Sequence, residues 1–238
     1  MNPIHLLRRQ PNNNASQIIS FAGLHEQHIG TLFYEKIFVA CFCFIEHSFN
    51  NTMSLLSSII YFIWFLSEVM LNRLLRSKKT DQQNEDKGSL TLIWIVIFVS
   101  IFSAIFMAKS ISLPIMDSAI IVYIGLAIII VGILLRIMII RTLGQFFTVD
   151  VTIKQDHKLK KDGFYNYIRH PSYSASLITV IGFGISLNNY ASLVLVTVLI
   201  TIAFLIRINV EEKLLTAHFG DEYVDYKKNT KKLIPFIY

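Results

Sequence analysis

Five long apolar segments, four of them without any charged residue, constrain this chain more than any other feature of its sequence. They are residues 54–71, 90–108, 118–135, 172–187 and 190–206. A helix of about 20 mostly apolar residues crosses the hydrocarbon core of a bilayer, and about 17 are enough in a short span. Only 16% of the residues are charged, against about a quarter in soluble domains. The sequence therefore predicts an all-α integral membrane protein with about five transmembrane helices.

Basic residues gather in every second connection between these segments. Apart from Arg136, past which the third apolar run resumes as far as Ile140, 17 of the 22 Lys and Arg residues lie between the first and second segments, between the third and fourth, and in the tail that starts at Arg207, while the opposite connections hold only Lys109. Because Lys and Arg concentrate in the cytoplasmic loops of membrane proteins, we predict a multi-pass protein whose C-terminus and basic face are cytoplasmic. The net charge of +6 then requires no nucleic-acid partner.

Composition and spacing exclude several other classes. With 10 Gly, 5 Pro and 2 Cys, the chain is neither collagen-like, nor disordered, nor a disulfide scaffold. Cys41 and Cys43 have no further Cys or His at ligand spacing, so no metal site is expected.

The chain divides by composition into three parts. Residues 1–52 form an N-terminal extension in which only 37–45 is apolar. This run is too short to span a membrane and is typical of an interfacial helix. The alternative is that Met53 is the true start of the protein. Residues 53–140 contain three predicted transmembrane helices. Residues 141–238 contain a helical hairpin over 172–206, whose tight turn is predicted at Asn188-Asn189.

Charged residues are predicted to meet at one end of this hairpin. Pro171 and Ser172 are typical of a first helical turn, so Arg169 and His170 lie at a helix N-terminus, which favours an anion. Arg207 and Glu211 share one helical face at the end of the fifth segment, which returns to the same level. Ionisable groups at such a depth usually serve a function. The structural alternatives are that Arg169 only extends its charge to the membrane interface and that Arg207 and Glu211 form a simple ion pair.

The tail over residues 218–226 alternates aromatic and charged residues, which is typical of an amphipathic segment. We expect it to form a cytoplasmic cap over the hairpin end, and a surface-bound tail without a role in the site is the alternative. On the third segment, the small residues Gly125 and Gly132 allow close contact with either a neighbouring helix or a second protomer.

Four separated motifs, taken together and in this order, resemble the isoprenylcysteine carboxyl methyltransferase family. They are Gly163-x-Tyr165-x-Tyr167-x-Arg169-His170-Pro171-Ser172-Tyr173, Arg207-x-x-x-Glu211-Glu212, Phe219-Gly220-x-x-Tyr223-x-x-Tyr226 and Leu233-Ile234-Pro235. The resemblance covers about residues 118–238, and the broader superfamily includes phospholipid N-methyltransferases and membrane sterol reductases.

The resemblance implies a methyltransferase-like catalytic region over 141–238 and S-adenosylmethionine as the methyl donor. The positions that it assigns to the donor are His157, Lys158, Leu159, Lys160, Tyr165, Arg169, His170, Pro171, Ser172 and Glu211. Arg207 matches the position that holds the acceptor carboxylate, and with Glu211 it forms the expected catalytic pair. Lys160 and Lys161 depart from the family, which usually has an apolar residue and a Thr or similar there. The absence of a Gly-x-Gly-x-x-Gly motif agrees with a donor pocket that has no Rossmann sheet.

The function that the resemblance implies is carboxyl O-methylation of an isoprenylcysteine or a related lipidic carboxylate, delivered from the bilayer. Such an acceptor is already ionised at neutral pH, which fits the absence of an obvious general base. N-methylation of a phospholipid headgroup is the alternative enzyme function, and it would need His170 or Glu212 as a base. A nicotinamide-dependent reductase would need a phosphate site at Lys158, Lys160 and Lys161. In a non-catalytic membrane scaffold or transporter subunit, the charged residues would only be ion pairs.

Overall fold

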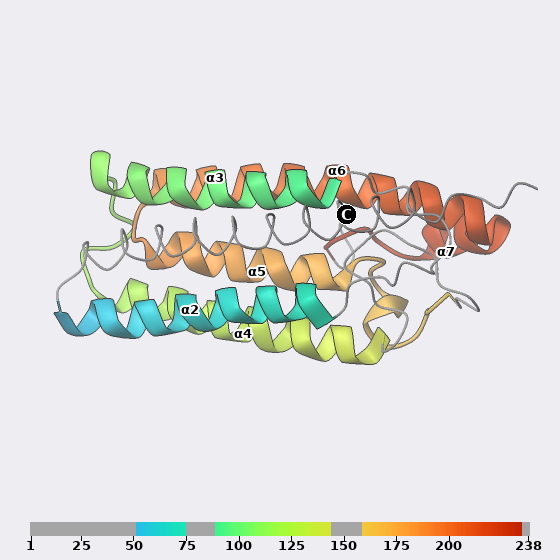
Figure 1. Cartoon of the computed structure of the whole chain (residues 1–238), viewed down its shortest axis with the longest axis horizontal. Coiled ribbons are helices and arrows are strands. Elements are labelled where there is room, and N and C mark those ends of the chain that lie inside the picture. The colour runs from blue at the N-terminus through green and yellow to red at the C-terminus, as the bar shows by residue number, and fades with distance from the viewer. Residues whose placement is uncertain (1–50, 75–88, 144–158, 235–238) are drawn as a thin grey trace, which may run out of the picture. The chain divides into compact units, whose positions relative to one another are not determined.

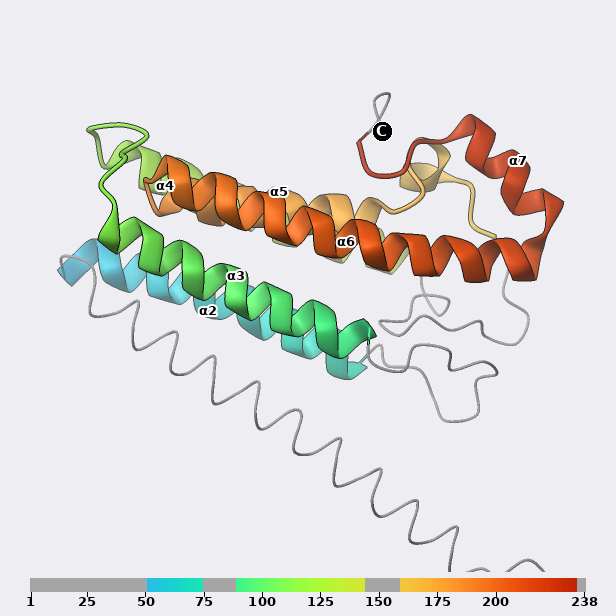
Figure 2. The same ribbon diagram turned by 90° about the horizontal axis from the view of Figure 1, so that it is seen from above.

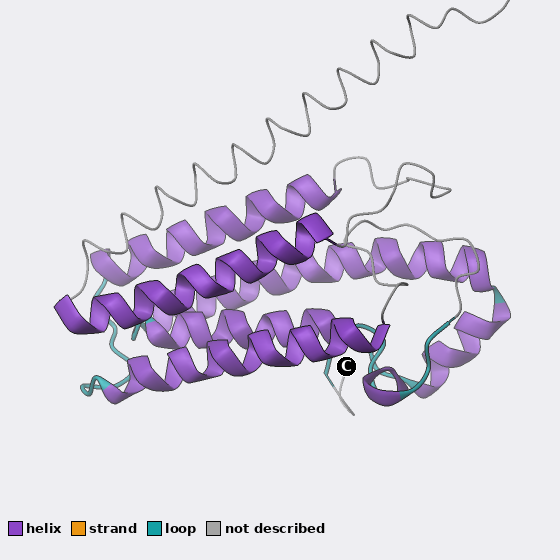
Figure 3. Ribbon diagram, turned by 60° about the horizontal axis from the view of Figure 1, so that its bottom comes forward, coloured by secondary structure: helices purple, strands orange, loops and turns teal. Residues whose placement is uncertain are grey.

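A computed structural model of the chain describes residues 51–74, 89–143 and 159–234. The chain divides into two compact units, Met1–His47 and Ser48–Tyr238, and every described residue lies in the second. The described helices, shown in Figures 1 and 3, are α2 (Asn51–Leu74), α3 (Ser89–Ser110), α4 (Ile120–Leu143), α5 (Pro171–Ser186), α6 (Tyr190–Phe219) and α7 (Asp221–Asn229), with a short 3-10 turn η2 (Gly163–Asn166). Within these ranges there is no β-strand, so the described part of the chain is all-helical, as predicted. The predicted N-terminal extension lies outside the described residues except for Asn51 and Thr52, which begin α2.

Three described helices are long and apolar enough to cross a membrane. They contain the stretches Leu92–Ser110, Ile120–Leu143 and Tyr190–Phe219. Helices suit this environment because every backbone hydrogen bond within the bilayer is made inside the segment itself. The apolar part of α2, Leu55–Leu71, and the 16-residue α5 are shorter than these three.

The closest helix packing joins α4 and α5 over a seam of small residues. A Cβ atom placed on Gly125 of α4 would lie 2.4 Å from Ser186 N and 2.7 Å from Gly182 O, both in the backbone of α5. A Cβ on Gly132 would lie 2.8 Å from Thr179 N. Both glycines therefore face α5 of the same chain, where the absence of a side chain allows the two backbones to touch.

The remaining helices flank this pair. Helix α3 packs against α6, which also packs against α5, while α2 packs against α4 (Figures 1 and 2). On α2, the Tyr61 hydroxyl and Ser186 Oγ lie 2.7 Å apart, and the Tyr61 ring lies edge-on to Phe183. Glu68, the one charge of the first apolar segment, forms an ion pair with Arg136 of α4 at 3.1 Å. The outward faces of these helices carry many exposed apolar side chains, as a lipid-facing surface requires.

The turn between α5 and α6 is fastened to the loop that joins α3 and α4. Asn188 has a φ of 48°, a left-handed conformation that Asn tolerates better than most residues. Its side chain accepts hydrogen bonds from Ile115 N and Met116 N at 3.0 and 3.1 Å. Asn189 caps α6 by accepting from Ser192 N at 3.0 Å. This turn fixes one end of the hairpin, so that the start of α5 and the end of α6 come together at the other.

Helix α6 continues 13 residues beyond Ile206, where the apolar segment ends. Its 30 residues make it about 45 Å long, at 1.5 Å for each residue. It ends at Gly220, whose φ of 56° turns the chain back into α7. In Figures 1 and 2 the last turns of α6 extend past α3 and lead into α7.

Candidate active site

The segment before α5 is held in place by the tail that follows α7. Arg169 N donates to Lys231 O at 2.8 Å, His170 N donates to Lys232 O at 3.2 Å, and Lys231 N donates to Tyr167 O at 3.0 Å. Ser174 Oγ in the first turn of α5 donates to Leu233 O. This short parallel pairing presents Arg169 and His170 at the start of α5, where Pro171 is the first residue of the helix.

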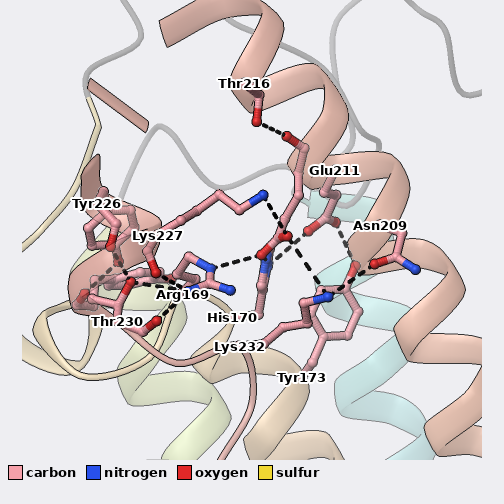
Figure 4. A network of polar contacts seen from close by, with 12 residues as sticks. Arg169, His170, Tyr173, Asn209, Glu211, Thr216, Tyr226, Lys227, Thr230 and Lys232 are labelled. Atoms are coloured by element: carbon pink, nitrogen blue, oxygen red, sulfur yellow. Dashed lines mark hydrogen bonds and ion pairs between the residues drawn. The ribbon is translucent and has the colours of Figure 1, made fainter. Parts of the chain in front are cut away.

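His170 lies between two consecutive carboxylates of α6 (Figure 4). Its Nδ1 is 3.3 Å from Glu211 Oε2, and its Nε2 is 3.4 Å from Glu212 Oε1. Both ring nitrogens can donate only when the imidazole is protonated. Burial alone lowers the pKa of His170, but its hydrogen bonds to Glu211 and Glu212 outweigh burial and raise the pKa above its usual value. The two carboxylates therefore favour the protonated, cationic form of His170.

Arg169 connects α6 to the tail. Its Nε donates to Glu212 Oε1 at 2.8 Å, and both side chains are 8% exposed. Its Nη1 donates to the carbonyls of Thr230 and Lys227, the latter at 3.2 Å. The Arg169 side chain thus does not simply extend to the membrane interface. It is buried, and it donates hydrogen bonds to Glu212 of α6, to Lys227 of α7 and to Thr230, which follows α7.

Glu212 is the acceptor that the cations of the site share. Besides Arg169 and His170, the Nζ atoms of Lys227 and Lys232 lie 3.4 and 3.9 Å from Glu212 Oε2. Lys232 Nζ also donates to Asn209 Oδ1 at 3.1 Å, as Figure 4 shows. Pairing of this kind compensates the cost of burying a carboxylate.

Glu211 and Arg207 lie on the side of the cluster that faces Tyr173. The Tyr173 hydroxyl donates to Glu211 Oε1 at 2.6 Å. Arg207, which is 2% exposed, places its Nε 3.8 Å from the same oxygen, which is an ion pair beyond ordinary hydrogen-bond distance. The Tyr173 ring packs on Phe204, one turn before Arg207, with centroids 5.1 Å apart. Arg207 and Glu211, the expected catalytic pair, are therefore adjacent, and they lie beside Tyr173, whose ring packs on Phe204.

The other positions assigned to the donor lie before α5, in its first turn, or outside the described residues. Tyr165 is buried against Ile139 and Ala175, and its carbonyl accepts from the Tyr226 hydroxyl. Lys160 pairs with Asp162 at 2.9 Å. Three more assigned positions are Pro171 and Ser172 in the first turn of α5 and Leu159, which is half-buried, as Lys160 is. His157 and Lys158 lie outside the described residues.

Sequence reasoning missed several residues that the structure brings into the site. Tyr173 belongs to a family motif but is not among the predicted site residues, although a tyrosine one turn from His170 can reach the same helix face. Lys227, Thr230 and Lys232 carry no local signal, because these contacts are with residues 15 or more positions away in the sequence. Among the described residues, no group of three or more His, Cys, Asp or Glu could hold a metal ion.

Comparison with known families identifies a relationship for the C-terminal half of the chain. Residues 124–217 match the model of the isoprenylcysteine carboxyl methyltransferase (ICMT) family. This range includes α5 and most of α6, and with them Arg169, His170, Arg207, Glu211 and Glu212. The resemblance of the C-terminal half to this family is confirmed.

Individual relatives match the same half of the chain. Protein-S-isoprenylcysteine O-methyltransferase B of Arabidopsis thaliana is 38% identical over 115 residues, which are 48% of this chain and 58% of the relative. The protein-S-isoprenylcysteine O-methyltransferase of Schizosaccharomyces pombe is 40% identical over 96 residues, which are 40% of this chain and 41% of the relative. The chain thus spans about half the length of these relatives.

A solved structure extends the likeness in fold to most of the chain. The eukaryotic intramembrane Ras methyltransferase ICMT (isoprenylcysteine carboxyl methyltransferase), solved without a monobody, superposes with a TM-score of 0.51 and 22% identity, covering 91% of this chain and 89% of that one. At this level of identity, the match shows the fold alone. The fold is therefore that of an ICMT-like integral membrane protein.

Proposed function

We propose that this protein transfers a methyl group from S-adenosylmethionine to the carboxylate of an isoprenylated cysteine or a related lipidic acid. The observation that carries the proposal is the meeting of Arg169 and His170 with Arg207, Glu211 and Glu212, inside the region that matches the ICMT family. The relatives from Arabidopsis thaliana and Schizosaccharomyces pombe carry the corresponding enzyme name.

The chemistry of the cluster fits the two ligands. S-Adenosylmethionine, when bound, supplies a methyl group on a sulfonium centre together with an ammonium and a carboxylate. Glu211, the more accessible of the two carboxylates in the cluster, is the group assigned to the ammonium. Arg207 presents a planar fork that matches an acceptor carboxylate. A transfer of this type depends on positioning in a dry site more than on a strong base.

Two features favour a carboxylate acceptor over a lipid amine. An amine must lose a proton, and the bases available for that step are His170 and Glu212. The carboxylates of Glu211 and Glu212 raise the pKa of His170 and so favour its protonated form, and Glu212 is paired with Arg169 at 2.8 Å. Neither group is therefore suited to remove a proton, whereas an ionised carboxylate needs no base.

The proposal includes the way the chain sits in the membrane. Five helices, α2 to α6, cross it, with the shorter α5 lying along α4. The end with the charged cluster faces the cytoplasm, because the described Lys160, Lys161, Lys213, Lys227 and Lys228 gather there, and basic residues favour that side. Helix α7 covers this end as a cap, with Tyr223 and Tyr226 buried and its charged residues toward water. A lipidic acceptor reaches Arg207 from the bilayer along α6, where Ile202 and Ile206 are exposed.

Incubation of membranes containing the protein with methyl-labelled S-adenosylmethionine and a farnesylated or geranylgeranylated cysteine acceptor tests the function. The expected product releases labelled methanol in base, as a carboxyl methyl ester does. A base-stable label in phospholipid would identify an N-methyltransferase instead, and absence of saturable donor binding would favour a scaffold. Glu211→Gln should lose most of the activity. Asp225→Asn is the matched control and should retain full activity, because Asp225 is exposed and pairs with the equally exposed Lys228.

A further inference from the structure

Tyr223 of α7 carries a buried hydroxyl group that has no partner. The side chain is 1% exposed and is one of the largest fully buried side chains. In the described part of the chain its hydroxyl makes no hydrogen bond. Native proteins keep very few buried polar atoms in this state, because each has given up water without gaining a protein partner. Such an atom beside a functional site is therefore a candidate for a hydrogen bond to a ligand.

The position of Tyr223 distinguishes it from the other unpartnered buried atoms. In the described part of the chain, the residues with such atoms are Ser57, Ser58, Arg136, Thr197 and Tyr223. The first four belong to the apolar helices α2, α4 and α6. Tyr223 alone among them lies in α7, beside the charged cluster. Lys227 Nζ is 6.0 Å from the centroid of the Tyr223 ring and 3.4 Å from Glu212 Oε2. The phenol is thus adjacent to the ion pairs that hold Glu212.

A second contact places Tyr223 near another part of the expected donor site. Its ring centroid is 6.0 Å from that of Tyr226, and the Tyr226 hydroxyl donates to the carbonyl of Tyr165. Tyr165 and Glu211 are both positions assigned to the methyl donor. Tyr223 therefore lies on the helix that contacts Tyr165 through Tyr226 and Glu212, the neighbour of Glu211, through Lys227 (Figure 4 shows Tyr226 and Lys227 beside Arg169).

The phenol is also held ready to donate. Burial, with the Glu212 carboxylate adding to it, raises the pKa of Tyr223 well above its usual value, so the hydroxyl keeps its proton at neutral pH. Helix α7 is fixed on its C-terminal side, because Arg169 donates to the carbonyls of Lys227 and Thr230. The position of the hydroxyl is therefore set before any ligand arrives, which lowers the entropy cost of binding.

We propose that Tyr223 is a further donor-binding residue, whose hydroxyl donates a hydrogen bond to bound S-adenosylmethionine. The inference rests on the proposed function. It adds α7 to the donor site and gives the tail a binding role, beyond covering the end of the helices.

Tyr223→Phe tests this with two measurements on the full-length protein in detergent. The change removes one oxygen and retains the ring. Because that oxygen has no partner in the ligand-free protein, the ligand-free melting temperature should stay the same or rise. The dissociation constant for S-adenosylmethionine, measured by calorimetry, should rise about tenfold, which corresponds to about 1.4 kcal/mol.

Tyr226→Phe is the matched control, because its hydroxyl has a partner in the ligand-free protein. That variant should melt at a lower temperature without ligand. Equal donor affinities for the parent and Tyr223→Phe would overturn the inference, and so would a ligand-free melting temperature that falls as far in Tyr223→Phe as in Tyr226→Phe. A parent protein that binds no S-adenosylmethionine would instead contradict the proposed function itself, and the inference would fall with it.

Discussion

Arg169 and Glu212 are 43 residues apart in the sequence and form a buried ion pair, with Arg169 Nε 2.8 Å from Glu212 Oε1. The contact joins the segment before α5 to the C-terminal part of α6, and the same guanidinium binds the carbonyls of Lys227 and Thr230. Three parts of the chain that are distant in sequence are therefore fixed by one side chain. Breaking a buried pair costs about 3–5 kcal/mol when a charge is left behind.

We expect Arg169→Met and Glu212→Gln each to lower the melting temperature strongly. The double variant should be less destabilised than the sum of the two, because residues in contact are coupled. Thermal unfolding of the four proteins measures this coupling. Lys228→Gln is the control: Lys228 Nζ lies only 2.7 Å from Asp225 Oδ1, but both side chains are 69% exposed, so its melting temperature should not change. Additive effects at Arg169 and Glu212 would show that the pair is not coupled.

The raised pKa of His170 predicts how stability depends on pH. Folding favours the protonated ring, since the folded-state pKa lies above the ordinary value of 6.5. The stabilisation is complete below about pH 6.5 and is lost as the pH rises through the folded-state pKa. The melting temperature of the parent should therefore exceed that of His170→Gln most at pH 6, and the difference should shrink toward pH 9.

His218→Gln provides the comparison for the pH series, because His218 is an exposed histidine in the last turn of α6. Its melting temperature should follow that of the parent at every pH. Parallel curves for the parent and His170→Gln would mean that His170 does not titrate with folding.

The hairpin could be predicted from the sequence because its signals are local. An uninterrupted apolar run, a Pro at the first helical position and two Asn residues at the turn act over a few residues. The contacts of the tail could not be predicted in this way. Lys231 N donates to Tyr167 O across 64 positions, and no periodicity in the sequence encodes such a pairing.

The same distinction explains the two glutamates. From the sequence, Glu211 is assigned by its motif and by the helical face that it shares with Arg207, whereas Glu212 belongs to the same motif and is considered as a base for another reaction. Consecutive residues of an α-helix point about 100° apart. This difference directs Glu211 to Tyr173 and Arg207, and Glu212 to Arg169 and the tail. Which of the two faces the tail depends on tertiary packing, and therefore only the structure separates their surroundings.

The seam between α4 and α5 makes Gly125→Ala a sharp test of the packing. The added methyl group would meet backbone atoms of α5 within 2.7 Å, and backbone cannot turn aside as a side chain can. Overpacking of this kind costs about 1–3 kcal/mol, so the melting temperature should fall clearly. Ala127→Val adds methyl groups on the exposed face of the same helix and should have little effect. Equal melting temperatures for the two variants would contradict the close contact.

The proposed orientation predicts which engineered cysteines react in intact cells. In a background with Cys41→Ser and Cys43→Ser, a cysteine at Ser112 in the loop after α3 should react with a membrane-impermeant maleimide. A cysteine at Asp225, which is exposed on α7, should react only after permeabilisation. The opposite pattern would reverse the orientation inferred from the basic residues.

Arg207 and Glu211 lie one helical turn apart, with Nε 3.8 Å from Oε1, and we expect them to bind different ligands. Arg207→Lys keeps the charge but removes the planar fork that holds two carboxylate oxygens. It should raise the apparent KM for the acceptor or lower kcat, with donor affinity nearly unchanged. Glu211→Gln removes the charge assigned to the donor's ammonium and should weaken donor binding by about 1.5–3 kcal/mol.

Calorimetric titration of both variants with S-adenosylmethionine separates this assignment from a purely structural ion pair. If Arg207 and Glu211 only stabilised each other, both substitutions would lower the melting temperature to a similar extent, and neither would discriminate between donor and acceptor. The assignment predicts instead that donor affinity falls only in Glu211→Gln, because the charge opposite the ammonium is lost there. In Arg207→Lys the defect should be confined to the acceptor, because a lysine supplies a single point charge where two parallel hydrogen bonds are required. Equal donor affinities for the parent and both variants would remove Glu211 from the donor site.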